Sequence, residues 1–125
     1  MKGSFEVAVL ASGSKGNATV IKAGDTAFLV DAGISCRRIT NGLKEFGLHP
    51  YDLSGVLITH EHKDHVGGLP VLSRKYKLPV FANEKTWQAM EQRSQIERSC
   101  HRFLPADFSL GGITVSSFPV SHDAA

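Results

Sequence analysis

The chain has 125 residues, 42% of them hydrophobic, which fits a single globular domain with a buried core. Its formal net charge of +2 is too close to neutral to indicate nucleic-acid or membrane binding by itself, and no apolar run is long enough to span a membrane. Two cysteines, Cys36 and Cys100, are too few for a disulfide framework, so we expect a reduced, cytoplasmic protein.

The first thirty residues contain apolar runs and apolar–polar alternation, separated by turn residues. Alternation predicts strands, because successive side chains of a strand point to opposite faces. The segment 12–17 has two glycines and two serines, so we expect a turn or loop there. Gly24-Asp25 is expected to form a tight turn. The predicted strands are 5–11, 18–22 and 26–30.

Helices and strands alternate in the rest of the chain. Ser35 can cap a helix that runs to about Phe46 and ends before Gly47. Asn83 can cap a second helix over residues 84–95. Such alternation predicts an α/β or α+β sandwich. The other predicted elements are strands at 55–59, 79–82, 101–104, 108–110 and 113–118, and a helix at 66–76 with Pro70 in its first turn.

The most specific feature is the segment His60-Glu61-His62-Lys63-Asp64-His65, which directly follows the predicted buried strand. Strand-like spacing would place the first two histidines and the aspartate on one side, where their side chains can converge. Imidazole nitrogen and carboxylate oxygen suit zinc, manganese or iron. Gly67 and Gly68 would let the chain turn sharply close to the metals. A solvated polar loop is the alternative, but it gives no reason for this spacing.

The HxHxDH pattern of residues 60–65 resembles the metallo-β-lactamase superfamily, which implies an αββα sandwich with metals at the sheet edges. Asp31 is similar to the family's first aspartate, which orients the metal site without binding the metal. His122, after a predicted strand, is similar to the histidine of the third motif. Further segments resemble the YycJ/WalJ-type branch of cytoplasmic 5′-to-3′ DNA exonucleases, namely 10–17, 31–35, 78–87 and 118–125.

The resemblance implies two divalent metal ions, zinc or manganese, and phosphodiester hydrolysis by a metal-activated hydroxide. His60, His62 and His122 would hold the first ion. Asp64 and His65 would contribute to the second. Asp64 would also act in catalysis by orienting the hydroxide. DNA is the expected substrate, and no membrane partner is expected.

A glycine- and serine-rich loop is a second candidate feature of the site. Backbone N–H groups of Ser12, Gly13, Ser14 and Asn17 could cradle a substrate phosphate. An ordinary hairpin turn explains the same composition. The family resemblance places this loop near the active site, and both interpretations stay open.

The superfamily carries a bridging aspartate and a final histidine in the second half of its domain, whereas only three residues follow His122. We therefore expect residues 1–125 to be the N-terminal half of one metallo-β-lactamase-fold domain, truncated at the C-terminus. Two alternatives to a DNA exonuclease remain. One is a small-molecule phosphodiesterase or thioesterase of the same fold, because the metal site alone does not select the substrate. The other is a non-catalytic fragment that binds one metal or none.

Overall fold

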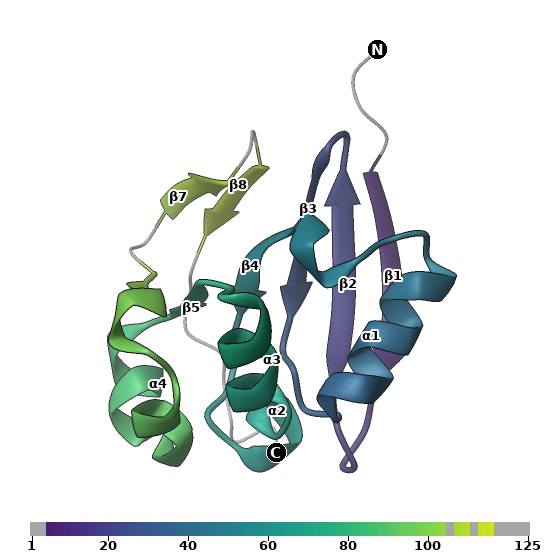
Figure 1. Ribbon diagram of the computed structural model, residues 1–125. Helices are drawn as coiled ribbons and strands as arrows, with labels where there is room; N and C mark the ends of the chain where they lie inside the picture. Colours follow the sequence, from purple (N-terminus) through teal and green to yellow (C-terminus); the bar gives the residue numbers. More distant parts are fainter. Residues whose placement is uncertain (1–4, 105–106, 111–112, 117–125) are drawn as a thin grey trace.

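A six-stranded mixed sheet forms the centre of the protein, as shown by a computed structural model that describes residues 5–104, 107–110 and 113–116 (Figure 1). Its strand order is β1-β2-β3-β4-β5-β6, and β7 pairs with β8 in a separate two-stranded sheet. The strands are β1 (Phe5–Ala11), β2 (Ala18–Ala23), β3 (Thr26–Val30), β4 (Leu53–Leu57), β5 (Val80–Ala82), β6 (His101–Phe103), β7 (Asp107–Leu110) and β8 (Ile113–Ser116).

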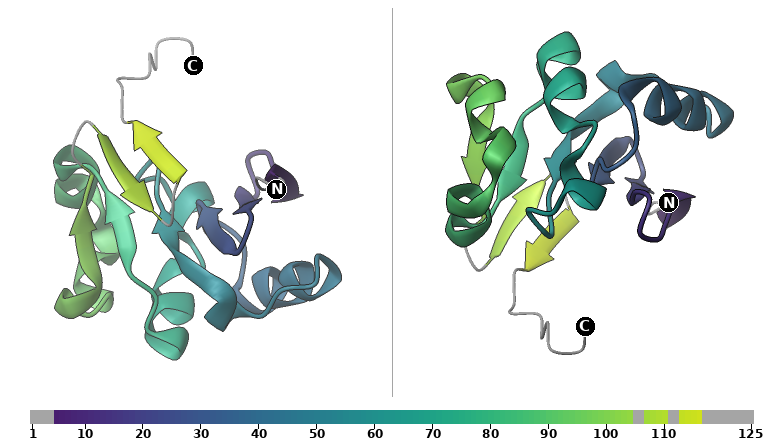
Figure 2. Two further views of the ribbon diagram at one scale, coloured as in Figure 1. Left: turned by 90° about the horizontal axis from the view of Figure 1, so that it is seen from above. Right: turned by 90° about the horizontal axis from the view of Figure 1, so that it is seen from below.

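The helices cover one face of the six-stranded sheet, and the β7–β8 hairpin lies on the opposite face (Figure 2). No helix in the described part of the chain is long and apolar enough to cross a membrane. The α-helices are α1 (Cys36–Glu45), α2 (Lys63–Val66), α3 (Leu69–Tyr76) and α4 (Glu84–Ala89). The 3₁₀ helices are η1 (Pro50–Asp52), η2 (Glu91–Gln95) and η3 (Arg98–Cys100).

Strand direction places the candidate site at one edge of the sheet. Strands β1, β2 and β3 pair antiparallel, whereas β3, β4, β5 and β6 run parallel to one another. Parallel strands bring their carboxyl ends to the same edge, where ligands of α/β sheets commonly bind. Asp31 follows β3 and the histidine segment follows β4. Residues 28 or more positions apart therefore meet at this edge.

The core lies between the sheet and the helix layer. Leu29 of β3, Val56 of β4 and Val80 of β5 have no exposed surface. They pack in one cluster with the inner faces of α1 and α3. Burying each such side chain stabilises the fold by roughly 1.5–3 kcal/mol. The residues of α1 and α3 in this cluster that are fully buried are Ile39, Leu43, Leu69 and Leu72.

The predicted α/β class is confirmed, and the caps of two helices were correctly predicted. Ser35 accepts a hydrogen bond from the Arg38 N–H (3.2 Å), and Asn83 accepts one from the Thr86 N–H (2.8 Å). The single helix predicted over 84–95 is wrong, because the backbone becomes extended at Met90 and η2 follows.

Candidate active site

The Asp31 carboxylate joins the ends of two neighbouring strands. Its Oδ1 accepts the Thr59 N–H (2.8 Å), and its Oδ2 accepts the Thr59 hydroxyl (2.6 Å). The same Oδ2 lies 2.8 Å from His65 Nδ1. Asp31 is buried and has a φ of 66°, a left-handed conformation that aspartate tolerates better than most residues. One side chain thus fixes both the segment after β4 and a histidine of the motif.

His65 is held in one orientation by this contact. Because a carboxylate only accepts hydrogen bonds, His65 Nδ1 carries the proton toward Asp31. The basic nitrogen of the ring is then Nε2, which lies 3.7 Å from Asp64 Oδ2. Two ligands bound to one zinc at about 2.0–2.2 Å are separated by roughly 3–4 Å. The spacing of Nε2 and Oδ2 therefore fits a shared divalent ion.

The three histidine rings of the motif gather around His60. The His60 ring centroid lies 4.6 Å from that of His65 and 6.3 Å from that of His62. Thr59 Oγ1 lies 3.0 Å from His60 Nδ1. Since the Thr59 hydroxyl already donates its proton to Asp31, it must accept from His60, so Nδ1 is the protonated nitrogen there too. His62 is the most open of the three, with 67% of its side chain exposed, and lies 3.5 Å from Glu61.

Asp64 is fastened to the loop that precedes β2. The Asn17 backbone N–H donates to the Asp64 carbonyl (2.7 Å). The Asn17 side-chain amide donates to the same carbonyl (3.1 Å) and to Asp64 Oδ2 (3.4 Å). Asn17 also closes its own loop, because its Oδ1 accepts the Gly13 N–H (3.2 Å). The loop and the histidine motif, 47 residues apart at these contacts, form one unit.

The expectation that strand-like spacing aligns His60, His62 and Asp64 is wrong for the aspartate. Strand β4 ends at Leu57, and helix α2 begins at Lys63, so Asp64 projects from a helical turn. Asp64 and the next residue, His65, nevertheless bring Oδ2 and Nε2 to within 3.7 Å of each other.

Glycines allow the backbone segments of the site to touch. A Cβ added at Gly33 would lie 1.8 Å from the Asp64 carbonyl oxygen, and one at Gly68 would lie 1.8 Å from the Ile34 carbonyl oxygen. The expected turn at Gly67 and Gly68 is present between α2 and α3, but their negative φ values of −56° and −95° do not require glycine. Their small size instead permits close packing against the segment after β3.

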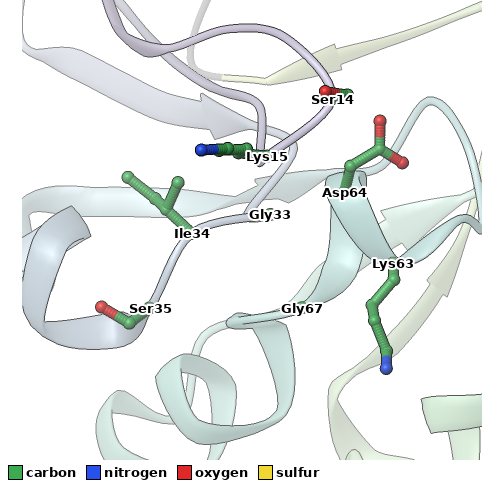
Figure 3. Close-up of a pocket in the computed structure, with 8 residues that line it drawn as sticks. All are labelled: Ser14, Lys15, Gly33, Ile34, Ser35, Lys63, Asp64 and Gly67. Atoms are coloured by element: carbon green, nitrogen blue, oxygen red, sulfur yellow. The ribbon is translucent and has the colours of Figure 1, made fainter.

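A pocket of about 370 Å³ lies between the loop, the segment after β3 and α2. Figure 3 shows Ser14 and Lys15 of the loop, Ile34 of the segment after β3 and Asp64 of α2 around this pocket. The Lys63 side chain is directed away from Ser14 and Lys15 in the same view. The residues that line the pocket are Ser14, Lys15, Gly33, Ile34, Ser35, Lys63, Asp64 and Gly67.

The donors fit a divalent metal by chemistry, but no closed cage is formed. Within residues 5–104, 107–110 and 113–116, no group of three or more His, Cys, Asp or Glu side chains is arranged to hold an ion. Asp64 and His65 form a pair at ligand spacing, with His60 beside them. His122, the third histidine predicted for the first ion, lies outside the described residues.

The sequence did not single out Thr59, and it singled out Asn17 only as a candidate contact to a substrate phosphate. Thr59 bridges Asp31 to His60 through its hydroxyl, and Asn17 anchors Asp64 through both backbone and side chain. A polar residue immediately before the first histidine is the only sequence signal for Thr59. The role of Asn17 depends on a contact across the fold, which no local pattern predicts.

Comparisons with known proteins identify the family. The sequence profile of the metallo-β-lactamase superfamily matches residues 11–120. The chain is 45% identical to exodeoxyribonuclease WalJ of Streptococcus pneumoniae over 96% of its length, and 48% identical to exodeoxyribonuclease YycJ of Bacillus anthracis over 94%. It spans 46% of the length of each relative. The solved structure of the Rm3 metallo-β-lactamase superimposes with a TM-score of 0.70 at 20% identity, covering 88% of this chain and 47% of that one.

Proposed function

The chain belongs to the metallo-β-lactamase superfamily, and from this premise we propose that the protein is a metal-dependent 5′-to-3′ DNA exonuclease. The observation that carries the proposal is the connected arrangement of Asp31, His65 and Asp64, in a chain 45–48% identical to two proteins named exodeoxyribonucleases. A cytoplasmic location is part of the proposal, and the free thiols of Cys36 and Cys100 are consistent with it.

The proposed ligands divide into two sets. His60, His62 and His122 would hold one divalent ion, and Asp64 with His65 would contribute to a second. The 3.7 Å spacing of His65 Nε2 and Asp64 Oδ2 supports the second set. Nitrogen and oxygen donors of this kind suit zinc or manganese. Such ions, when bound, lower the pKa of water and stabilise charge on the oxygens of a reacting phosphoryl group.

The chain's own residues would prepare the site for this chemistry. Asp31 keeps the proton on His65 Nδ1 and so directs the basic Nε2 toward Asp64. Outer carboxylates of this type orient metal ligands in many metalloenzymes. Asn17 restrains the Asp64 carboxylate, which can accept a proton or a hydrogen bond from the attacking water. These contacts would hold the reacting groups in place before the substrate arrives.

A phosphate subsite would lie beside Asp64. The pocket there contains Ser14 and Lys15, which offer a hydroxyl and a positive charge to a phosphate oxygen. The predicted phosphate loop comprises Ser12, Gly13, Ser14 and Asn17, and the Gly13 N–H already donates to Asn17 within it. Ser14 is the member of this set that lines the pocket, so we assign Ser14 to substrate contact.

The test is hydrolysis of end-labelled duplex DNA by the protein at the full length of its gene. With divalent metal, we expect nucleotides to be released from the 5′ end. His62→Ala should lower the rate of hydrolysis by at least about 100-fold. Substituting a residue that only orients a metal ligand already lowers metal affinity or activity by about 10–100-fold, and His62 is itself a proposed ligand. His49→Ala is the matched control, since His49 caps η1 at the start of β4, away from the strand's carboxyl end.

Assays with other substrates test separately whether the protein is a metallohydrolase and whether DNA is its substrate. Hydrolysis of thioesters or small phosphodiesters, with duplex DNA left intact, would overturn the nuclease proposal and retain a metallohydrolase. Loss of activity in His49→Ala equal to that in His62→Ala would show that the histidine substitution acts through folding.

A further inference from the structure

The 3₁₀ helix η2 separates two pockets on the helix side of the protein. The first, of about 360 Å³, adjoins the histidine motif, and the second, of about 550 Å³, lies beyond η2. Consecutive residues of η2 face the two, with Gln92 on the first and Arg93 on the second. The first pocket is lined by Glu61, His62, Lys63, Ala89, Glu91 and Gln92. The second is lined by Arg93, Ser94, Ile96, Glu97, Arg98 and His101.

The second pocket carries positive charge that the described residues do not neutralise. Its one carboxylate, Glu97, is paired with Lys77 outside the pocket lining at 2.9 Å. The hydrogen bond and the negative charge of Glu97 raise the pKa of Lys77. Arg93 donates to the Trp87 carbonyl at 3.3 Å, a neutral partner. In the described part of the chain, the Arg98 side chain has no hydrogen-bond or ion-pair partner.

The stacked rings of Trp87 and His101 lie next to this pocket. The Trp87 ring stacks on His101, with ring centroids 4.2 Å apart and planes 18° apart. The Trp87 indole N–H donates to the Arg102 carbonyl (2.6 Å), and His101 Nε2 lies 2.9 Å from the Ile96 carbonyl. Trp87 is buried. A pocket beside such packed rings loses little conformational entropy when a ligand binds.

We infer that the pocket of Arg93 and Arg98 binds backbone phosphates of the nucleic-acid strand that is cut beside His62. The inference rests on the proposed nuclease function and adds a second, separate contact to it. Guanidinium groups bind phosphate oxygens through paired N–H donors, which makes arginine suited to this role. A strand leaving the histidines across η2 would reach both arginines.

The spacing fits a strand that is longer than one nucleotide. A five-residue 3₁₀ segment such as η2 is about 10 Å long, at about 2.0 Å per residue. Successive phosphates of one DNA strand advance about 3.4 Å along the helix axis. The arginines would therefore contact phosphates one or more nucleotides away from the cleaved bond. A substrate with a single phosphate cannot occupy both pockets.

The test compares long and short substrates with Arg93→Ala/Arg98→Ala in the protein at the full length of its gene. DNA affinity is measured at several salt concentrations in a His62→Ala background, so that cleavage does not interfere. Each lost phosphate contact should reduce the slope of log affinity against log salt by about 1, so we expect a reduction of about 2. In the background with His62 intact, hydrolysis of bis(p-nitrophenyl) phosphate should keep its kcat.

Two further variants keep the result interpretable. Arg98→Ala alone should reduce the slope by about 1, and it leaves the Arg93 contact to Trp87 in place. Arg37→Ala/Arg38→Ala removes the same charge from exposed positions on α1, at the other end of the sheet from α4 (Figure 1). This control pair should leave the slope within experimental error of the parent.

The outcomes distinguish the inference from the function on which it rests. An unchanged slope in the Arg93 and Arg98 variants of a protein that degrades DNA would refute the phosphate pocket alone. Equal slope reductions in the control pair would indicate a net-charge effect and also refute it. Absence of DNA cleavage by the parent, with bis(p-nitrophenyl) phosphate hydrolysed, would instead remove the nuclease proposal.

Discussion

At the scale of single residues, the role of Asp31 in the site depends on its hydrogen-bond partners more than on its residue type. Its place after β3 and its resemblance to a family aspartate were visible in the sequence. Its partners Thr59 and His65 are 28 and 34 positions away, so their hydrogen bonds follow from the parallel pairing of β3 and β4. A left-handed φ costs a residue with a side chain about 1–2 kcal/mol. The fold keeps this strain at the residue that organises the candidate site.

Asp31→Asn should weaken metal binding without unfolding the protein. Both the Thr59 hydroxyl and His65 Nδ1–H donate toward Asp31 Oδ2, and an amide cannot accept at both of its terminal atoms. His65 would lose its fixed tautomer, so we expect the affinity for zinc to fall by about 10–100-fold. Isothermal titration calorimetry of the full-length protein measures this directly.

The matched control for this substitution is Asp25→Asn, in the exposed turn between β2 and β3. It removes the same charge and should leave zinc affinity unchanged. If Asp31→Asn also binds zinc as tightly as the parent, the carboxylate does not orient His65 for metal binding.

At the scale of elements, local rules predicted the starts of α1 and α4 and the ends of α1 and α3, but not the end of α4. Ser35 and Asn83 were found because capping depends on a few adjacent residues. The break after α4 was missed, since Met90 is a good helix former and nothing next to it signals a stop. Met90 is almost fully buried in the core cluster. Tertiary packing, which a local pattern does not contain, accompanies the change of backbone direction there.

The histidine motif also combines a feature that local sequence predicted with one that tertiary packing determines. The sequence correctly placed the histidine segment after a buried strand, at the sheet edge. It predicted strand geometry for Asp64, whereas the structure forms α2. This helical turn packs against the segment after β3, where Gly68 N–H donates to the Ala32 carbonyl (2.7 Å) and Ala32 N–H donates to the His65 carbonyl (2.8 Å). Backbone contacts between distant segments therefore determine the geometry of the site.

Gly68→Ala tests this packing. The added methyl group would lie 1.8 Å from the Ile34 carbonyl oxygen, and a backbone atom cannot move aside as a side-chain tip can. We expect the free energy of unfolding to fall by more than ~3 kcal/mol, above the usual range for an overpacked core. Chemical denaturation of the full-length protein gives this value.

Gly47→Ala provides the comparison for a glycine that is needed for its conformation. Gly47 has a φ of 82° and open space around its Cα, so alanine there should cost only about 1–2 kcal/mol. Equal losses of stability at the two positions would contradict the close-packing role of Gly68.

At the scale of the whole molecule, the two faces of the six-stranded sheet differ. The helices cover one face, and the core around Leu29 and Val56 lies beneath them. On β1, Val7 and Val9 are 54% and 62% exposed. In the described sheet, β1 has a strand partner on one side only. Exposed apolar side chains on an edge strand favour association with another strand or another layer.

We predict that residues 1–125, expressed alone, are inactive, bind at most one metal tightly, and associate or fold only partly. The first reason is the exposed surface of β1 around Val7 and Val9, which a second sheet would cover in a two-layer sandwich. The second is the donor set, in which the ligands that we propose for the second ion are Asp64 and His65. A site with so few ligands gains too little metal-binding energy to compensate for an incomplete core.

Three measurements test this prediction: light scattering, bound-metal analysis and the DNA assay. Each is made on residues 1–125 and on the protein at the full length of its gene. A protein of the relatives' full length should be monodisperse and active, since the chain spans 46% of the length of these two relatives. Val7→Thr/Val9→Thr should reduce association of the segment, because it removes apolar surface while keeping β-branched residues suited to a strand. A monomeric segment that unfolds cooperatively, holds two metals and degrades DNA at the full rate would mean that these residues already form a complete domain.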